Sequence, residues 1–248
     1  MLRRRARLCF LTTLSLGLAA CETSGGGQDV GRILGDIAGS TGQTGAGALS
    51  QAEITAGLKE ALTVGAQRAT SRLSAQDGYF ADPQVKIPLP GVLGEAQARL
   101  QPLGLSAPLD DLQLKVNRAA EKAVPTARQL AVQAVTSMSV SDALGILNGG
   151  DTAATDYLRS RTETQLRTAF KPYFQDALAQ SGALTALDAA VARYGAGLVT
   201  TDSRGWLTEN ATGAALDGLF YYVAREEAAI RRDPVKRTSE LLRRVFGG

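Results

Sequence analysis

The chain has 248 residues, which is enough for one domain of ordinary size or at most two small ones. Hydrophobic residues make up 44% of it and charged residues 21%, which is the composition of a globular protein with a core. There is no histidine, and both cysteines lie within the first 21 residues. These counts exclude His-dependent nucleophilic catalysis, Cys/His zinc sites and a disulfide in the remainder of the chain.

The first 20 residues have the layout of a signal peptide. Met1–Arg7 is positively charged, and Leu8–Leu18 is apolar but shorter than the roughly 20 residues that a membrane-spanning helix needs. Four of the 27 basic residues precede the apolar stretch, so the processed chain has 23 basic and 24 acidic residues. This balance argues against nucleic acid as a partner.

Residues 18–21 (LAAC) resemble the lipobox of bacterial lipoproteins. The resemblance implies that Cys21 receives a thioether-linked diacylglycerol, that the chain is cleaved before it, and that the new amine is acylated. Several acyl chains would anchor the protein stably to a membrane. Glu22, in place of Asp, implies by the sorting rule of two-membrane bacteria the inner leaflet of the outer membrane, facing the periplasm. The alternative is an ordinary secretory signal with a chance cysteine.

Residues 21–49 have the composition of a flexible tether. Glu22–Leu49 holds nine of the 27 glycines and would reach about 30 Å. A short apolar stretch, Val30–Ile37, interrupts it and could dock on the domain or the membrane. We therefore expect a signal peptide over residues 1–20, the lipid-modified Cys21 and its tether over 21–49, and one helical domain over 50–248.

Residues 50–103 are predicted to form two helices joined by an extended segment. Ser50 and Glu53 have capping-box spacing, and apolar residues then recur on one helical face as far as about Arg72. Residues 74–90 hold three prolines within eight positions, which keep that segment extended. A short helix is expected over about 91–103.

Residues 110–179 are also predicted to be helical. One helix is expected to start at Asp110 or Asp111, with Pro125 producing either a kink or a junction between two helices. We expect Ser141 to cap a short turn that ends at Leu147. Asp151 is expected to cap a helix over residues 152–179, in which Pro172 predicts a second kink.

The remaining helices are expected over 183–194, from about 216 to the break at Asp233-Pro234, and at the end of the chain. The terminal helix either packs on the domain or lies on anionic lipid head groups, through the apolar face Leu241, Leu242, Val245 and Phe246. No strand pattern persists for more than four residues. The predicted fold class is all-α, a single domain of about seven to nine helices.

With these segments placed, the chain resembles bacterial lipoproteins of the domain-of-unknown-function 4197 family. The resemblance rests on residues 57–62 (GLKEAL), 85–90 (VKIPLP), 117–125 (NRAAEKAVP), 146–151 (ILNGGD), 215–220 (ALDGLF), 233–234 (DP) and 241–247 (LLRRVFG). These occur in order over roughly residues 50–247. The resemblance implies an exported all-helical domain and implies no particular activity.

Three residues on one helix form the first candidate polar site. Asn117, Arg118 and Glu121 make the densest polar group on a strongly patterned helix. Glu121 lies opposite the apolar stripe, so it is either solvated or paired with Arg118 or Lys122. Because Leu114 lies near the same azimuth, the second face could also be covered, and a pocket lined by Asn117 and Glu121 is the alternative.

Two further positions could carry a polar site. Asn148 to Asp151 could present backbone N–H groups to an anion at a helix N-terminus, or could simply be a turn capped by Asp151. Glu227 lies within the apolar stripe of the last long helix. It must therefore pair, most simply with an arginine, leave the core, or face a cavity.

These observations leave three hypotheses for function. The first is a non-enzymatic, membrane-anchored lipoprotein that binds an envelope protein or envelope lipid through its surface. The alternative is a lipid- or small-molecule-binding domain with a cavity between helices, in which Asn117, Glu121 or Glu227 would anchor the ligand. A carboxylate-based or hard-metal enzyme is a distant third, since no catalytic residue, metal-ligand set or cofactor motif is evident. An enclosed cavity of several hundred Å³ would favour the second, and a filled core with an exposed apolar patch the first.

Overall fold

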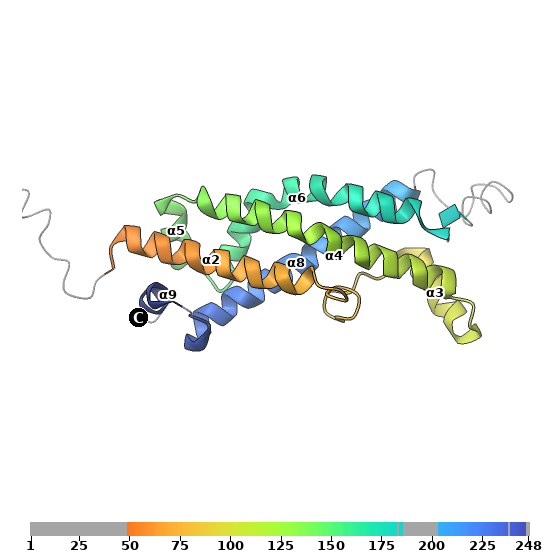
Figure 1. Ribbon diagram of the computed structural model, residues 1–248, viewed down its shortest axis with the longest axis horizontal. Helices are drawn as coiled ribbons and strands as arrows, with labels where there is room; N and C mark the ends of the chain where they lie inside the picture. The colour runs from red at the N-terminus through yellow and green to blue at the C-terminus, as the bar shows by residue number, and fades with distance from the viewer. Residues whose placement is uncertain (1–48, 183, 186–202, 238, 247–248) are drawn as a thin grey trace, which may run out of the picture. The chain divides into compact units, whose positions relative to one another are not determined.

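The computed structural model describes residues 49–182, 184–185, 203–237 and 239–246, and these form an all-helical domain (Figure 1). Cys21, the tether and nearly all of the helix expected over 183–194 lie outside the described residues. Within them the prediction of an all-α domain is confirmed. The elements are α2 (Gln51–Leu73), α3 (Gly91–Leu100), η1 (Gln101–Leu103), α4 (Ala107–Thr136), α5 (Val140–Leu147), α6 (Ala153–Ala179), α8 (Ser203–Arg232), η3 (Pro234–Lys236) and α9 (Glu240–Phe246).

Helix α2 begins as its sequence predicts. The Ser50 hydroxyl accepts a hydrogen bond from the Glu53 amide at 3.2 Å, and the Glu53 carboxylate accepts one from the Ser50 amide at 2.9 Å. This capping box satisfies two amides that a helix start otherwise leaves unpaired. The apolar stripe then points into the core through Leu58, Leu62, Ala66, Ala69 and Leu73.

Helix α4 starts earlier than predicted and is not divided by its proline. It begins at Ala107, and Asp110 lies in the first turn, where it accepts a hydrogen bond from the Ser106 hydroxyl at 2.7 Å. The helix continues through Pro125 to Thr136 as one element, so the junction between two helices is not found. Helix α6 likewise continues through Pro172. Close packing on neighbouring helices can outweigh the hydrogen bond that a proline removes.

The cap predicted for helix α5 is wrong. The N-cap residue is Ser139 and not Ser141, and the helix begins at Val140. The Ser139 hydroxyl accepts from the Asp142 amide at 3.1 Å, and the Asp142 carboxylate accepts from the Ser139 amide at 3.0 Å. Two serines stand close together here, and only the first has an acidic residue three positions after it.

The core lies where α4, α6 and α8 pack together, with α2 against both α4 and α8 (Figure 1). Alanines on the buried face of α4, among them Ala119, Ala120, Ala123 and Ala127, allow its neighbours to approach closely. The largest fully buried side chains include Tyr79, Phe170, Phe174, Leu112, Leu158, Leu166 and Leu216. No single described helix is long and apolar enough to cross a membrane; only α4 and α5 taken together, bent by 104°, have the required composition.

Helix α9 packs on the first half of α2. A Cβ atom added to Gly57 would stand 2.7 Å from Val245 Cγ2 and 3.2 Å from Leu241 Cγ, so only glycine allows this approach. Arg244 pairs with Glu53 at 2.9 Å across the same contact. The terminal helix therefore packs on the domain through Leu241 and Val245; the side chains of Leu242 and Phe246 fall outside the described part.

Candidate functional site

Residues 74–90, which connect α2 to α3, are held against α4 by Asn117. The side chain of Asn117 is fully buried. Its Oδ1 accepts from the Ile87 amide at 2.9 Å, and its Nδ2 donates to the Ile87 carbonyl at 2.9 Å and to the Gln113 carbonyl at 2.8 Å. The amide group thus pairs with Ile87 as a neighbouring strand would, which satisfies an extended backbone inside a helical protein.

Glu121 and Arg118 hold the beginning of the same segment. The buried Glu121 carboxylate accepts from the amides of Tyr79 and Phe80 at 3.2 and 3.3 Å. Arg118 pairs with Glu121 at 2.7 Å and with Asp77 at 2.8 Å. Asp77 has a left-handed backbone, with φ of 67°, so its ion pair fixes a turn that most residues would not adopt. Glu121 is therefore a buried, paired residue and is not solvated.

Two tyrosines and Asp82 join the segment to α8. The Tyr79 hydroxyl donates to the Ala215 carbonyl at 2.8 Å. Burial, together with the negative charge of Glu121, raises the pKa of Tyr79. Asp82 accepts hydrogen bonds from Tyr222 and, at 2.9 Å, from Arg72. Burial alone would raise the pKa of Asp82, but the hydrogen bonds from Tyr222 and Arg72 lower it overall.

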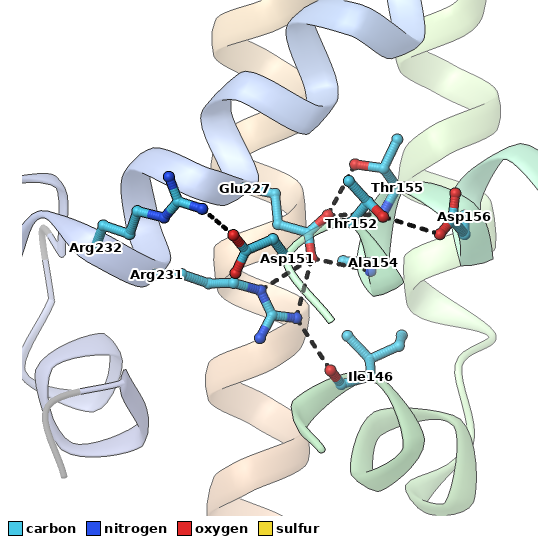
Figure 2. A network of polar contacts seen from close by, with 9 residues as sticks. All are labelled: Ile146, Asp151, Thr152, Ala154, Thr155, Asp156, Glu227, Arg231 and Arg232. Atoms are coloured by element: carbon cyan, nitrogen blue, oxygen red, sulfur yellow. Dashed lines mark hydrogen bonds and ion pairs between the residues drawn. The ribbon is translucent and has the colours of Figure 1, made fainter. Parts of the chain in front are cut away.

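A second polar network lies where α5 and α6 meet α8 (Figure 2). The Glu227 carboxylate, on α8, accepts from the backbone amides of Ala154 and Thr155 at 3.0 and 2.9 Å. It also accepts from the Thr155 hydroxyl at 2.8 Å. Ala154 and Thr155 are in the first turn of α6, whose N–H groups carry the positive end of the helix dipole. Glu227 thus caps α6 from another helix.

Arg231 completes this network one turn along α8. Its Nη2 lies 3.0 Å from Glu227 Oε1 and donates to the carbonyl of Ile146, in the last turn of α5, at 3.0 Å. The pair therefore places a carboxylate at the start of α6 and a guanidinium at the end of α5, which is the favourable sense for both helix dipoles. Asp151 pairs with Arg232 outside this buried contact.

The residues singled out from the sequence fall into two separate groups. The first group, on α4, contacts the 74–90 segment and consists of Asn117, Arg118 and Glu121. The second group lies at the α5–α6 connection and consists of Glu227, Asp151 and Asn148, of which Asn148 is an exposed C-cap residue. Two expectations for Asp151 are resolved. Asp151 does not cap α6, because the N-cap residue is Thr152. The Thr152 side chain makes no capping hydrogen bond to the helix either. The anion at that helix start is Glu227.

Sequence reasoning missed several members of both groups. The sequence analysis did not single out Tyr79, Asp82 and Tyr222. Tyr79 could have been noticed, because a tyrosine in a segment rich in turns and prolines often holds that segment on the core. Thr155 was missed because a threonine in a first helical turn is common. Arg231 could have been proposed, since it follows Glu227 by four positions on the same helix face.

The spaces between helices are small. A cavity of about 20 Å³ lies between α2 and α8, with Leu62, Ile230 and Glu227 among its lining residues, and one of about 10 Å³ lies under the proline-rich segment. Each holds about one water molecule at most. At the surface, an open hollow of about 360 Å³ lies beside the start of the 74–90 segment, with Asp77 and Asp82 among its lining residues. A surface cleft of about 180 Å³ between α4 and α6 is lined by Lys115, Arg118 and Lys122. The first two cations are already paired, with Asp111 and with Glu121 and Asp77, so the cleft has little net positive charge.

The buried polar groups of both networks form hydrogen bonds or ion pairs with other groups of the chain, and these contacts hold backbone segments in place. In the described ranges no three acidic side chains gather in a way that could hold a metal ion. The fold and the two networks define an all-helical domain whose conspicuous polar residues join distant segments. The family described as "Protein of unknown function (DUF4197)" matches residues 48–247, and the chain belongs to this family. No significant match is found among curated proteins or among solved structures.

Proposed function

We propose that the protein is a lipid-anchored lipoprotein of the bacterial cell envelope that binds another envelope component through its outer surface. It would be held at the inner leaflet of the outer membrane by acylated Cys21 and would face the periplasm. It would act without a cofactor and without catalysis. The sequence motif at residues 18–21 and the signal-peptide layout before it support the anchor.

One observation carries the choice of surface binding over a ligand cavity. The interior spaces of about 20 and 10 Å³ compare with about 300–1,000 Å³ for pockets that hold drug-sized ligands or cofactors. An acyl chain or a small metabolite would have to separate helices whose facing side chains are buried against one another. Large apolar side chains such as Leu103 and Trp206, meanwhile, are exposed. This combination favours contact through the outside of the domain.

A pair of cysteine substitutions tests the anchor. In cells that make the protein, Cys21→Ser should abolish both the incorporation of labelled fatty acid and the cleavage before residue 21, so that the signal segment stays on the chain. Cys9→Ser is the matched control, because Cys9 lies in the part that is removed, and it should change neither property. Wild-type protein without an acyl mass, or Cys21→Ser protein that is still cleaved before residue 21, would contradict the proposal.

A further inference from the structure

The positive charge of the processed chain is concentrated near its C-terminus. Residues 231–246, which include the end of α8, η3 and α9, hold six basic and two acidic side chains. The rest of the processed chain holds 17 basic and 22 acidic ones. We call residues 231–246 the basic end. A basic segment in a slightly acidic chain favours an anionic partner.

The basic end lies beside the start of α2 (Figure 1). Val245 of α9 faces Gly57 on the first half of α2. About one turn further along α2, Ala61 packs on Ile230, which directly precedes the basic end on α8. The tether of the proposed lipoprotein ends where α2 begins, at Gln51. It therefore joins the domain beside the basic end.

Two of the six cations in the basic end have no acidic partner among the described residues. The other four pair with carboxylates or donate to backbone carbonyls: Arg231, Arg232, Arg237 and Arg244. Lys236 and Arg243 are exposed, and no ion pair joins either side chain to the described part of the chain. These two cations can therefore bind a partner outside the domain.

Arg243 points away from the domain. Leu241 and Val245 face α2, and successive residues of a helix are turned by about 100°, so residue 243 lies on the opposite side of α9. Lys236 stands four positions before the first residue of α9, so its backbone lies within about 20 Å of that of Arg243. Both cations are thus close enough to meet one surface of a few lipid head groups.

Val235 adds an apolar side chain next to these cations. It is 85% exposed, lies in η3 and directly precedes Lys236. Segments that lie in the interfacial layer of a membrane combine such features, because the apolar side chain enters the head-group region while the cations bind phosphates. Protein interfaces, by contrast, are depleted of lysine. The basic end therefore fits an anionic lipid surface better than a protein surface.

The tether supplies the nearness that so small a contact needs. Residues 22–49 would reach about 30 Å from the acylated Cys21, which keeps the domain close to the membrane. A tethered contact is favoured by the high local concentration of its partner, even when the contact alone is weak. The membrane that holds the lipid anchor is thus always within reach of the basic end.

We infer that the basic end lies on the anionic head groups of the membrane that holds the anchor. In this arrangement Lys236 and Arg243 contact lipid phosphates and Val235 enters the head-group layer. The apolar face of α9 stays on α2, so the helix meets lipid only through its basic side. This inference rests on the proposed function, and it makes membrane lipid the envelope component that the outer surface binds.

Quenching by labelled lipid tests the inference. Val235→Cys in the full-length protein carries a fluorescent dye on the introduced thiol, which is the one reactive thiol when Cys9 is removed and Cys21 is acylated. The processed protein is reconstituted into phosphatidylcholine vesicles, with and without phosphatidylglycerol, that contain a lipid with a quencher on its head group. The expected result is strong quenching of the dye that requires phosphatidylglycerol.

The same dye on Leu103→Cys is the matched control. Leu103 is 68% exposed on η1, which follows α3, and Gln97 of α3 donates to Asp110 in the first turn of α4 at 2.7 Å. The first half of α2 is bonded instead to the last residue of α4, because Lys59 donates to the Thr136 carbonyl at 2.9 Å. These two ends of α4 are about 40 Å apart, so the dye at position 103 should stay unquenched.

Charge reversal shows whether the quenching depends on the two cations. Lys236→Glu combined with Arg243→Glu should reduce the quenching at position 235 about tenfold or more, since each cation near an anionic surface contributes to binding. Arg99→Glu combined with Lys122→Glu changes the net charge equally at exposed positions on α3 and α4, and should leave the quenching unchanged. The Tm of each variant is measured; if that of the first falls, Lys236→Gln combined with Arg243→Gln takes its place.

Three results would each overturn the inference: equal quenching at positions 235 and 103, quenching at 235 that does not require phosphatidylglycerol, or the same quenching in both charge-reversal variants. The result can be separated from that for the anchor. If the protein carries an acyl mass but the dye at 235 is not quenched, only the contact of the basic end is wrong. If the protein carries no acyl mass, the proposed function is wrong and this inference falls with it.

Discussion

The carboxylate of Glu227 accepts hydrogen bonds from both the amide and the hydroxyl of Thr155, at 2.9 and 2.8 Å, although 72 positions separate the two residues. The contact supplies to α6 the acceptor that a capping side chain would normally provide. It also explains how a carboxylate can occupy the apolar stripe of α8: helix N–H groups and Arg231 replace the water it loses.

This relationship predicts a large loss of stability on removing the carboxylate. Glu227→Ala leaves Arg231 and the first-turn amides of α6 buried without their acceptor, and we expect it to lower the free energy of unfolding by about 3–5 kcal/mol. Asp217→Ala is the control, because Asp217 is 73% exposed in its pair with Arg159 and should cost at most about 1 kcal/mol. Urea unfolding followed by circular dichroism measures both. Equal costs for the two substitutions would disprove the capping role.

Removing the side-chain amide of Asn117 should release the 74–90 segment. Asn117→Ala leaves the N–H group of Ile87 buried and unpaired, at about 1–3 kcal/mol, whereas the Ile87 carbonyl keeps a longer hydrogen bond from Gln113 Nε2 at 3.4 Å. Asn210→Ala is the control, since the exposed Asn210 likewise donates to a carbonyl four positions earlier, at 2.8 Å. Hydrogen exchange should show that Ile87 loses protection in the first variant alone. Unchanged protection of Ile87 would show that Asn117 does not hold the segment.

Two glycine substitutions should shift Tm in opposite directions. A Cβ on Gly218 would stand 3.0 Å from both Tyr79 Cε1 and Val85 Cβ, which are buried and cannot withdraw, so Gly218→Ala should cost about 1–3 kcal/mol. A Cβ on Gly65 would meet Glu226 Cβ at 3.6 Å, an ordinary contact. Gly65→Ala should therefore stabilise α2 by about 0.5–1 kcal/mol. A higher Tm for Gly218→Ala would mean that α8 lies further from the 74–90 segment than described.

The tyrosines should couple stability to alkaline pH. Burial and the charge of Glu121 raise the pKa of Tyr79, and burial and the hydrogen bond to Asp82 raise that of Tyr222. A tyrosine whose pKa is raised in the folded state contributes stability that is fully present below about pH 10, the ordinary tyrosine pKa. This stability is lost as the pH rises further. A titration followed by tyrosinate absorbance should show a late phase that coincides with unfolding. Tyr79→Phe should reduce that phase, and an unchanged late phase would contradict the assignment.

Local patterns in the sequence predicted the fold because their physical causes are local. The Ser50–Glu53 cap, the stripe on α2 and the break at Asp233-Pro234 depend on residues within about one turn of each other. The same patterns predicted Ser141 as the cap of α5, whereas the cap is Ser139. Several polar residues near a helix start are compatible with a cap, so the pattern alone does not choose between them. Pro125 was expected to produce either a kink or a junction between two helices, and the junction is not found, because α4 continues through it as one element.

The networks could be predicted only in part. Pairing of Glu227 with an arginine is confirmed by Arg231, and pairing of Glu121 with Arg118 is confirmed as well. The contact of Glu227 with the start of α6 could not be predicted, because it depends on how α8 crosses α6. The segment that Asn117 holds could not be predicted either, since Ile87 is 30 positions away and is joined to it only by packing.

Native mass spectrometry of the protein extracted from cell membranes tests the central proposal most directly. The account predicts a chain that begins at Cys21, with the mass of a diacylglyceryl group and an additional acyl chain, and with no small molecule bound in stoichiometric amount. A chain cleaved elsewhere or lacking acyl groups would contradict the anchor. A small ligand retained at one per chain would contradict binding through the outer surface.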